Sequence, residues 1–247
     1  MKRIALLLIL IICVSLAGCG KVICSIEGCE NEAVEDTTYE ESYCSMHLVN
    51  KQAFEKSQDA YINIKASYDI ITDFAVDYYE IWRIGIFEPD QIREQGVQFL
   101  AKYLRNISEE ELRMGVIMDA QKRKDGGATG LTEEIVNNPD LYLSMSKNEY
   151  LWSICPFSVI YAYEISGMKT DAEGFLTTAK LQMKEMSEKY SDYEHYPKLK
   201  DLYATISSYF DTCFNQSQSF EQFAKLNKEY EKEASEYIAD LDFIFVE

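Results

Sequence analysis

Three cysteines and a histidine lie close together near the beginning of the chain. Cys24 and Cys29 are separated by four residues, and, after a further fourteen residues, Cys44 and His47 are separated by two. Zinc favours thiolate and imidazole ligands, and its structural sites take four of them in tetrahedral geometry. Gly28 directly precedes Cys29, and glycine permits the tight turn that points two thiolates at one ion. This spacing predicts a small zinc site.

The second half of this pattern, Tyr43-Cys44-Ser45-Met46-His47, resembles the small Tyr-Cys-x-x-His zinc modules of treble-clef or knuckle type. The resemblance covers only the residues from Cys24 to His47, and it implies that the zinc ligands are Cys24, Cys29, Cys44 and His47. Four protein ligands leave no open position for water, which is typical of a structural site and not of a catalytic one. The metal would replace a hydrophobic core that so short a segment cannot build.

The residues before the cluster have the parts of a secretory signal. Two basic residues at positions 2 and 3 precede an apolar run, residues 4–12, which is too short to span a bilayer. The sequence Leu16-Ala17-Gly18-Cys19 resembles the lipobox of bacterial lipoproteins. The resemblance implies that residues 1–18 are removed, that Cys19 carries the lipid, and that the protein is anchored on the extracytoplasmic face of the cell membrane.

Export also raises an alternative for the cysteines, because oxidising compartments favour disulfides. Cys13 leaves with the signal peptide and Cys19 takes the lipid, so five thiols remain, and five cannot all pair. A site that uses three of them leaves Cys155 and Cys213, either bonded to one another or simply buried. We favour zinc, while a disulfide within the first cysteine pair and thiols without ordered structure stay open as alternatives.

Acidic residues far outnumber basic ones. Without residues 1–18 the chain has 22 basic and 42 acidic residues, a net charge of −20. Such an acidic protein is repelled by nucleic acid, because protein binding to nucleic acid depends mainly on neutralising phosphates. An anionic bilayer repels it as well. Residues 22–50 contain no lysine or arginine but seven acidic residues. We therefore expect no nucleic-acid partner, and we expect lipid alone to hold the protein on the membrane.

Residues 51–247 are expected to form one all-α domain. Glycine and proline are few, at 11 and 4, and the chain has no low-complexity linker. Apolar residues repeat in steps of three and four from Lys51 to Ile84, with Ser57 as the one interruption, and this stripe predicts a long helix. Its apolar positions are Phe54, Tyr61, Ile64, Tyr68, Ile71, Ala75, Tyr78 and Trp82.

Further helices are predicted over residues 89–105, 108–124, 149–166, 171–192, 197–215 and 218–244, with a short one from Thr132 that breaks before Pro139 in the otherwise irregular segment 126–148. Residues 149–166 are apolar on nearly all sides, which is typical of a helix buried inside a bundle. Short connections imply antiparallel neighbours. The expected fold is a bundle of six or seven antiparallel helices, preceded by a small metal- or disulfide-stapled module in residues 19–50.

The helical body shows no motif typical of an active site. His195 is the only other histidine, and its place between two predicted helices favours an exposed loop residue. Lipoproteins of the imelysin type carry a His-x-x-Glu metal motif that this chain lacks, and it also lacks the Gly-x-Ser-x-Gly and HExxH motifs. We therefore name no catalytic residue.

The expected function is that of a non-enzymatic lipoprotein whose helical body binds an unknown protein or small molecule outside the membrane. The alternatives are a cell-envelope enzyme with an unrecognised active site in the helical domain, and a structural spacer. A cleft that contains Tyr61, Tyr68 or Trp152 with polar groups would favour ligand binding. Strongly perturbed carboxylates around His195 would favour an enzyme.

Overall fold

The computed structural model describes residues 21–88, 131–144, 157–214 and 219–246, together with single positions between 91 and 125. All the elements formed by these residues are helices, so the predicted all-α class is confirmed. They are α2 (Ser45–Phe87), α5 (Leu131–Asn137), α6 (Pro139–Ser144), α8 (Phe157–Ile165), α9 (Met168–Lys189), α10 (Tyr196–Phe214) and α11 (Phe220–Phe245).

The longest helix, α2, has 43 residues and is therefore about 64 Å long. It begins at Ser45, and not at Lys51 as the stripe predicts, and it continues past Gly85 to Phe87. The predicted stripe faces the core, since Tyr61, Ile64, Ile71, Ala75 and Tyr78 are all buried.

Ser57, the polar residue within the stripe, is fully buried as well. Its hydroxyl donates a hydrogen bond of 2.7 Å to the carbonyl of Ala53, one turn earlier. This bond satisfies the hydroxyl within the helix, so a serine is tolerated where the pattern requires an apolar residue.

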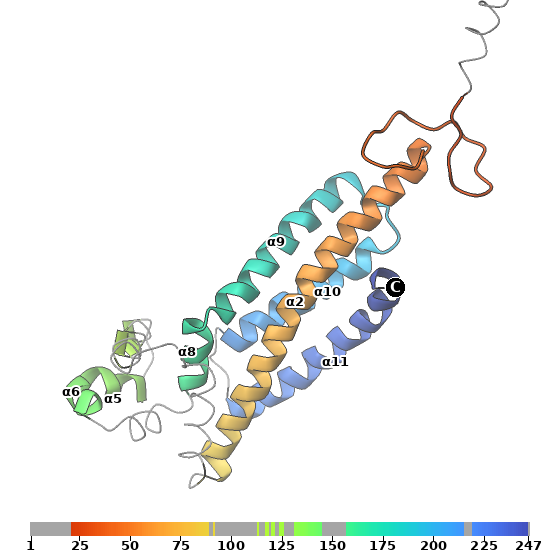
Figure 1. Cartoon of the computed structure of the whole chain (residues 1–247). Coiled ribbons are helices and arrows are strands. Elements are labelled where there is room, and N and C mark those ends of the chain that lie inside the picture. The colour runs from red at the N-terminus through yellow and green to blue at the C-terminus, as the bar shows by residue number, and fades with distance from the viewer. Residues whose placement is uncertain are drawn as a thin grey trace, which may run out of the picture.

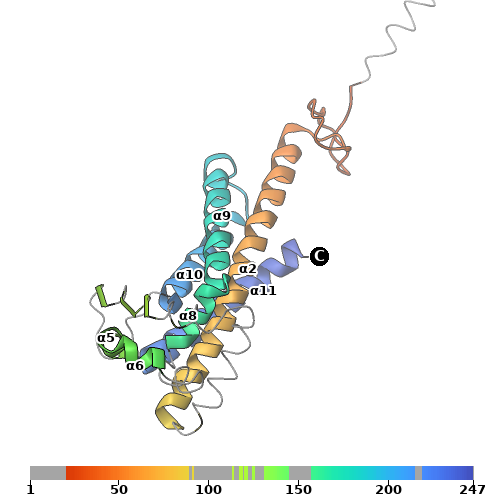
Figure 2. The ribbon, with the colours of Figure 1, turned by 60° about the vertical axis from the view of Figure 1, so that its left-hand side comes forward.

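Helices α9 and α11 run antiparallel to α2, and α10 runs parallel to it between them (Figure 1). The Ser67 hydroxyl of α2 reaches the Ala172 carbonyl near the start of α9, whereas Gln52, at the start of α2, reaches Tyr190 just after α9 ends. The view in Figure 2 shows the same arrangement, with α5 and α6 beside the end of the bundle that lies farthest from the N-terminal residues.

Phe74 of α2 lies at the centre of the aromatic core. Its ring centroid is 5.1 Å from that of Tyr163 in α8 and 4.4 Å from that of Phe214 in α10. Val159 and Ile160 of α8 are also buried. The prediction of a buried helix is therefore confirmed at Val159, Ile160, Ala162 and Tyr163 of α8, whereas residues 149–156 lie outside the described residues.

The segment 126–148 contains two short helices, α5 and α6. They are separated at Asn138, directly before Pro139, so the predicted break is confirmed. The segment contains two short helices, where one was expected. The helices predicted over residues 89–105 and 108–124 lie almost entirely outside the described residues.

A polar network joins α2 to the C-terminal part of α11. The Tyr61 hydroxyl donates to Asp242 Oδ1 at 2.7 Å, and Lys65 Nζ lies 2.6 Å from the same oxygen. Lys65 first, and Tyr61 second, hold the pKa of Asp242 below its ordinary value. A carboxylate with a lowered folded-state pKa stabilises the fold at pH values above its unfolded pKa, and this contribution is lost as the pH falls through the folded pKa.

We expect Asp242→Asn to lower the free energy of unfolding at pH 7 by about 1 kcal/mol, a modest figure because the side chain is 36% exposed and solvent screens the pair. At pH 3 the two proteins should differ by less, since this pH lies below the ordinary aspartate pKa of about 3.9 in the unfolded chain, and part of the stabilisation is then already lost. Urea unfolding at both pH values measures the two differences.

The control is Asp240→Asn. Asp240 lies on α11, as Asp242 does, and pairs with Lys198 of α10, but its side chain is 59% exposed. The control substitution should change stability by less than about 0.5 kcal/mol at either pH. An Asp242→Asn loss that is the same at pH 3 and pH 7 contradicts the assignment.

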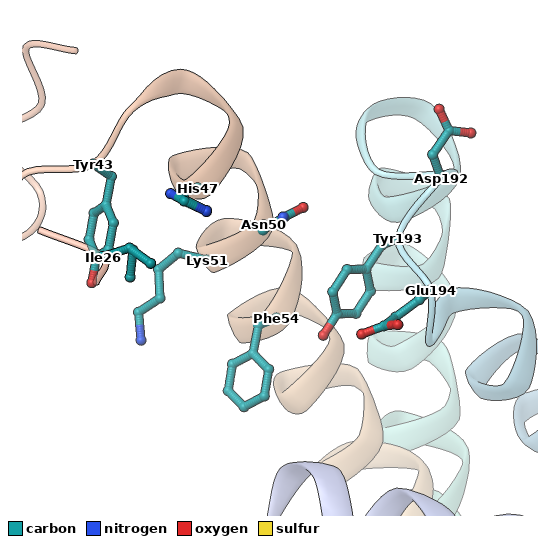
Figure 3. A pocket seen from close by; sticks show the side chains of 9 residues that line it. All are labelled: Ile26, Tyr43, His47, Asn50, Lys51, Phe54, Asp192, Tyr193 and Glu194. Carbon is teal, nitrogen blue, oxygen red and sulfur yellow. The ribbon is translucent and has the colours of Figure 1, made fainter. Parts of the chain in front are cut away.

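Residues 21–47 form a small N-terminal module at the tip of α2, beyond the ends of the neighbouring helices (Figures 1 and 2). Across from it lies the connection between α9 and α10, so that Tyr43 and His47 face the region of Tyr193 and Glu194 (Figure 3). Among the described residues, no helix has the length and apolar character needed to cross a membrane.

Candidate metal centre

The first two cysteines lie on a tight turn. Gly28 has a φ of +78°, a conformation that glycine adopts without a steric penalty, and the Cys29 amide donates to the Ile26 carbonyl at 3.0 Å. The chain then returns antiparallel to itself, because the Cys24 amide bonds to the Asn31 carbonyl at 3.0 Å. The turn predicted from Gly28 is therefore confirmed.

The other two residues of the cluster belong to the beginning of α2. Cys44 is the N-cap of the helix, and its carbonyl accepts a bond of 2.9 Å from the Leu48 amide. His47 follows in the first turn. The Cys44 side chain makes no capping bond, and cysteine is not a favoured N-cap residue. The sequence therefore gives no capping signal at this helix start, because a cysteine of the metal cluster occupies the N-cap position.

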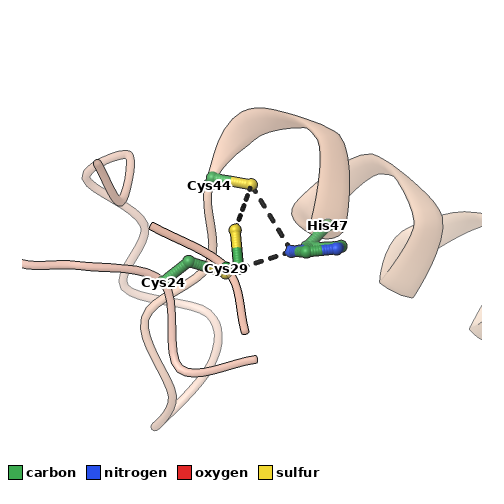
Figure 4. Close-up of side chains that lie close together, drawn as sticks. All are labelled: Cys24, Cys29, Cys44 and His47. Atoms are coloured by element: carbon green, nitrogen blue, oxygen red, sulfur yellow. Dashed lines mark hydrogen bonds between the residues drawn. The ribbon is translucent and has the colours of Figure 1, made fainter. Parts of the chain in front are cut away.

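The structure brings Cys24, Cys29, Cys44 and His47 together (Figure 4), with one ligand atom of each within 4.8 Å of the others. His47 Nδ1 lies 3.1 Å from Cys24 Sγ and 3.5 Å from Cys44 Sγ. The sulfurs of Cys29 and Cys44 are 3.9 Å apart. The group could hold a metal ion.

These distances agree with a tetrahedral site. Bonds of 2.3 Å to sulfur and about 2.0 Å to nitrogen place two sulfurs about 3.8 Å apart, and a sulfur and a nitrogen about 3.5 Å apart. Of the three distances given above, that from Cys24 to His47, at 3.1 Å, is the one that is appreciably shorter. These three distances are therefore close to those that a shared ion requires, and all four ligand atoms lie within 4.8 Å of one another.

Backbone amides adjust the acidity of the thiols. Burial raises the pKa of Cys24, but the amides of Cys44 and Ile26 lower it and prevail. The amide of His47 likewise holds the pKa of Cys44 below its ordinary value, against the effect of burial. For Cys29 the amide of Asn31 lowers the pKa, yet burial and the neighbouring sulfurs raise it overall. Two of the three thiols are thus prepared for the thiolate form that binds metal.

The module has backbone hydrogen bonds, such as that from the Ser25 amide to the Ser42 carbonyl at 2.7 Å, but its apolar core is small. Its hydrophobic cluster consists of the buried Cys24, Tyr43 and Cys44, with partly buried Cys29, Tyr39 and Leu48 around them. Tyr39 adds a bond of 2.7 Å from its hydroxyl to Glu55 on α2, a contact that no spacing in the sequence indicated. So small a core cannot order a segment of this length without a further constraint.

The disulfide alternative does not describe this structure, in which Cys24, Cys29 and Cys44 are free thiols. Cys213 is fully buried in α10. Cys19 and Cys155 lie outside the described residues, so the lipid attachment and any pairing of Cys155 stay predictions.

His195 is half-buried, so the expected exposure is wrong, whereas its expected position in a loop is confirmed. Its side chain is 26% exposed, and its Nε2 atom lies 3.1 Å from Glu194. The ring packs edge-on against Tyr193 and Phe245, because the connection between α9 and α10 folds back over the end of α11. The residue is at an interhelix turn, as predicted, and it is not part of the metal cluster.

The tyrosines named for a cleft on the bundle are packing residues. Tyr61 is fully buried, and Tyr68 packs against Tyr209 at a ring distance of 6.5 Å. Trp152 lies outside the described residues.

Comparison of the chain with models of protein families, with curated proteins and with solved structures finds no match.

We expect the chain to bind one Co²⁺ with the absorption bands of a tetrahedral thiolate site. Cys44→Ser should weaken binding about 100-fold or more, because removing even an outer hydrogen-bond partner of a metal ligand costs 10- to 100-fold. Serine is a favoured N-cap, so this variant keeps the start of α2. A spectroscopic titration measures the affinity.

The matched control is His195→Ala, which removes the other histidine and should leave Co²⁺ binding unchanged. Equal affinities of Cys44→Ser and the unaltered chain contradict the proposed ligand set.

Proposed function

We propose that this protein is an extracytoplasmic lipoprotein, anchored through lipid on Cys19, in which a structural zinc site joins the anchored segment to a helical bundle that binds a partner. The observation that carries the proposal is the convergence of Cys24, Cys29, Cys44 and His47 on one point.

Zinc is the metal that this donor set favours. Three sulfurs and one imidazole nitrogen form a soft ligand set of the kind found in structural zinc sites, whereas calcium and magnesium prefer oxygen. Four protein ligands fill a tetrahedral shell, so the ion has no open position at which to activate water. Its contribution is to connect the turn at Gly28 to the first turn of α2.

The anchor accounts for how so acidic a protein stays on a membrane. A net charge of −20 after removal of residues 1–18 opposes association with anionic lipid and with nucleic acid. Each buried methylene of an acyl chain contributes about 0.8 kcal/mol, so more than one chain on Cys19 gives stable attachment without any help from charge.

Elemental analysis of the chain purified from cell envelopes should find one zinc per chain. Chelation should increase amide hydrogen exchange in residues 22–47 and leave the helical signal of α9, α10 and α11 largely unchanged, because the ion supports the module and not the bundle. A chain without zinc, with Cys24 and Cys29 joined by a disulfide, contradicts the zinc proposal.

Cys19→Ala should move the protein from the membrane fraction to the soluble fraction, as measured by fractionation and immunoblotting. Cys13→Ala is the matched control, since it changes a cysteine of the proposed signal peptide and should leave the protein on the membrane. Retention of the Cys19→Ala protein on the membrane argues against the lipid anchor.

A further inference from the structure

A cavity of about 560 Å³ lies between the N-terminal module, the beginning of α2 and the connection between α9 and α10 (Figure 3). Small-molecule sites commonly have volumes of about 300 to 1,000 Å³. The module provides Ile26 and Tyr43, α2 provides Lys51 and Phe54, and the connection provides Tyr193 and Glu194. The wall therefore combines segments that are far apart in the sequence.

Opposite charges stand on two sides of this cavity. Lys51 and Glu194 lie on either side of Phe54 (Figure 3). Both charged groups are accessible to a ligand, since the side chain of Lys51 is 40% exposed and that of Glu194 is 79% exposed. Lys51 Nζ lies 3.3 Å from Glu55 and 6.0 Å from the centre of the Phe54 ring, which keeps its charge beside the cavity.

Apolar and neutral polar groups lie between the two charges. Ile26 is 40% exposed, and Phe54 is partly buried against the core. The Tyr193 hydroxyl points toward α2 (Figure 3). Burial, and then Glu194, raise the pKa of Tyr193 to about 12, so its hydroxyl stays neutral and can donate a hydrogen bond.

We infer that this cavity binds a small zwitterion with an apolar body, of the size of a free amino acid or a dipeptide. The ligand carboxylate pairs with Lys51, the ammonium group pairs with Glu194, and the apolar side chain rests on Phe54 and Tyr193. A plain anion is opposed by Glu194 and Asp192, and a plain cation has no group that can pair with Lys51. A molecule that carries both charges satisfies both ends.

The cavity adjoins the metal centre through His47, which lines it and also directs Nδ1 at the cysteine sulfurs. Tyr43, the residue before Cys44, forms part of the same wall. The inference rests on the proposed metal site in this respect, because the module must be ordered for the wall to exist. We therefore expect the metal-loaded protein to bind and the metal-free protein to lose binding.

Isothermal titration calorimetry of the full chain in phosphatidylcholine nanodiscs, with the dipeptide Leu-Leu as the probe, tests the inference. Leu-Leu should bind, and its N-acetyl and C-terminal amide derivatives should each bind about tenfold or more weakly, because each lacks one charge-assisted pair. Lys51→Gln should weaken Leu-Leu binding and abolish the preference over the amide. Glu194→Gln should abolish the preference over the acetylated derivative.

Lys56→Gln is the control, since Lys56 lies on α2, pairs with Glu185 at 3.5 Å and does not line the cavity. It should leave Leu-Leu affinity unchanged. Zinc is measured in every preparation, so a zinc-loaded chain that gives no heat with Leu-Leu overturns this inference alone, whereas a chain without zinc overturns the metal proposal. Equal affinity for the blocked derivatives also overturns the dipeptide assignment. So does tighter binding of glycerophosphoethanolamine, a lipid headgroup that carries the same two charges.

Discussion

The packing of α2 is the constraint on which the rest of the structure depends. It contacts α8, α9, α10 and α11, and its contacts with α11 alone extend from Phe54 to Trp82. Its first turn supplies Cys44 and His47 to the metal cluster, its middle supplies Lys65 to the network with α11, and its last turns supply Trp82 to the aromatic contacts around Phe220. A single helix of 43 residues therefore links the metal centre to the far end of the core, and a break within it would separate the two.

The fold could be predicted largely because apolar periodicity and burial coincide in a bundle. The predicted stripe of α2 faces the core, and α9, α10 and α11 also bury residues at helical spacing. Pro139 marks a break in both the sequence and the structure. Helix ends were harder to predict. Ser219 and Gln222 form a capping box at the start of α11, so that boundary carries a chemical signal. The N-cap of α2 is Cys44, whose side chain belongs to the metal cluster and makes no capping bond. Where a residue at a helix end binds another group and does not cap the helix, the sequence does not indicate where the helix begins.

The metal cluster and the cavity differ in how far the sequence could predict them. The four ligands come in two close pairs, and local spacing alone shows them to be suited to one ion. The cavity joins Phe54 to Tyr193 and Glu194, residues that are distant in the chain. Their meeting depends on the length of α9 and on its antiparallel register with α2, which the contacts of Ser67 and Tyr190 define. Periodicity predicts neither quantity, so no pattern in the sequence indicated this site.

The metal cluster also limits the distance between a lipid on Cys19 and the helical bundle. Between Cys19 and Ser45 the chain has 25 residues, and a flexible linker of that length has a root-mean-square span of about 25 to 30 Å. With ligand atoms of Cys24 and Cys44 held within 4.8 Å of one another, only the residues between Cys19 and Cys24 separate the lipid from the metal, a reach of at most about 18 Å. Under the proposed anchoring, the module and its cavity then lie beside the membrane surface. The bundle extends from there along α2, and the net negative charge of the body disfavours its collapse onto an anionic leaflet.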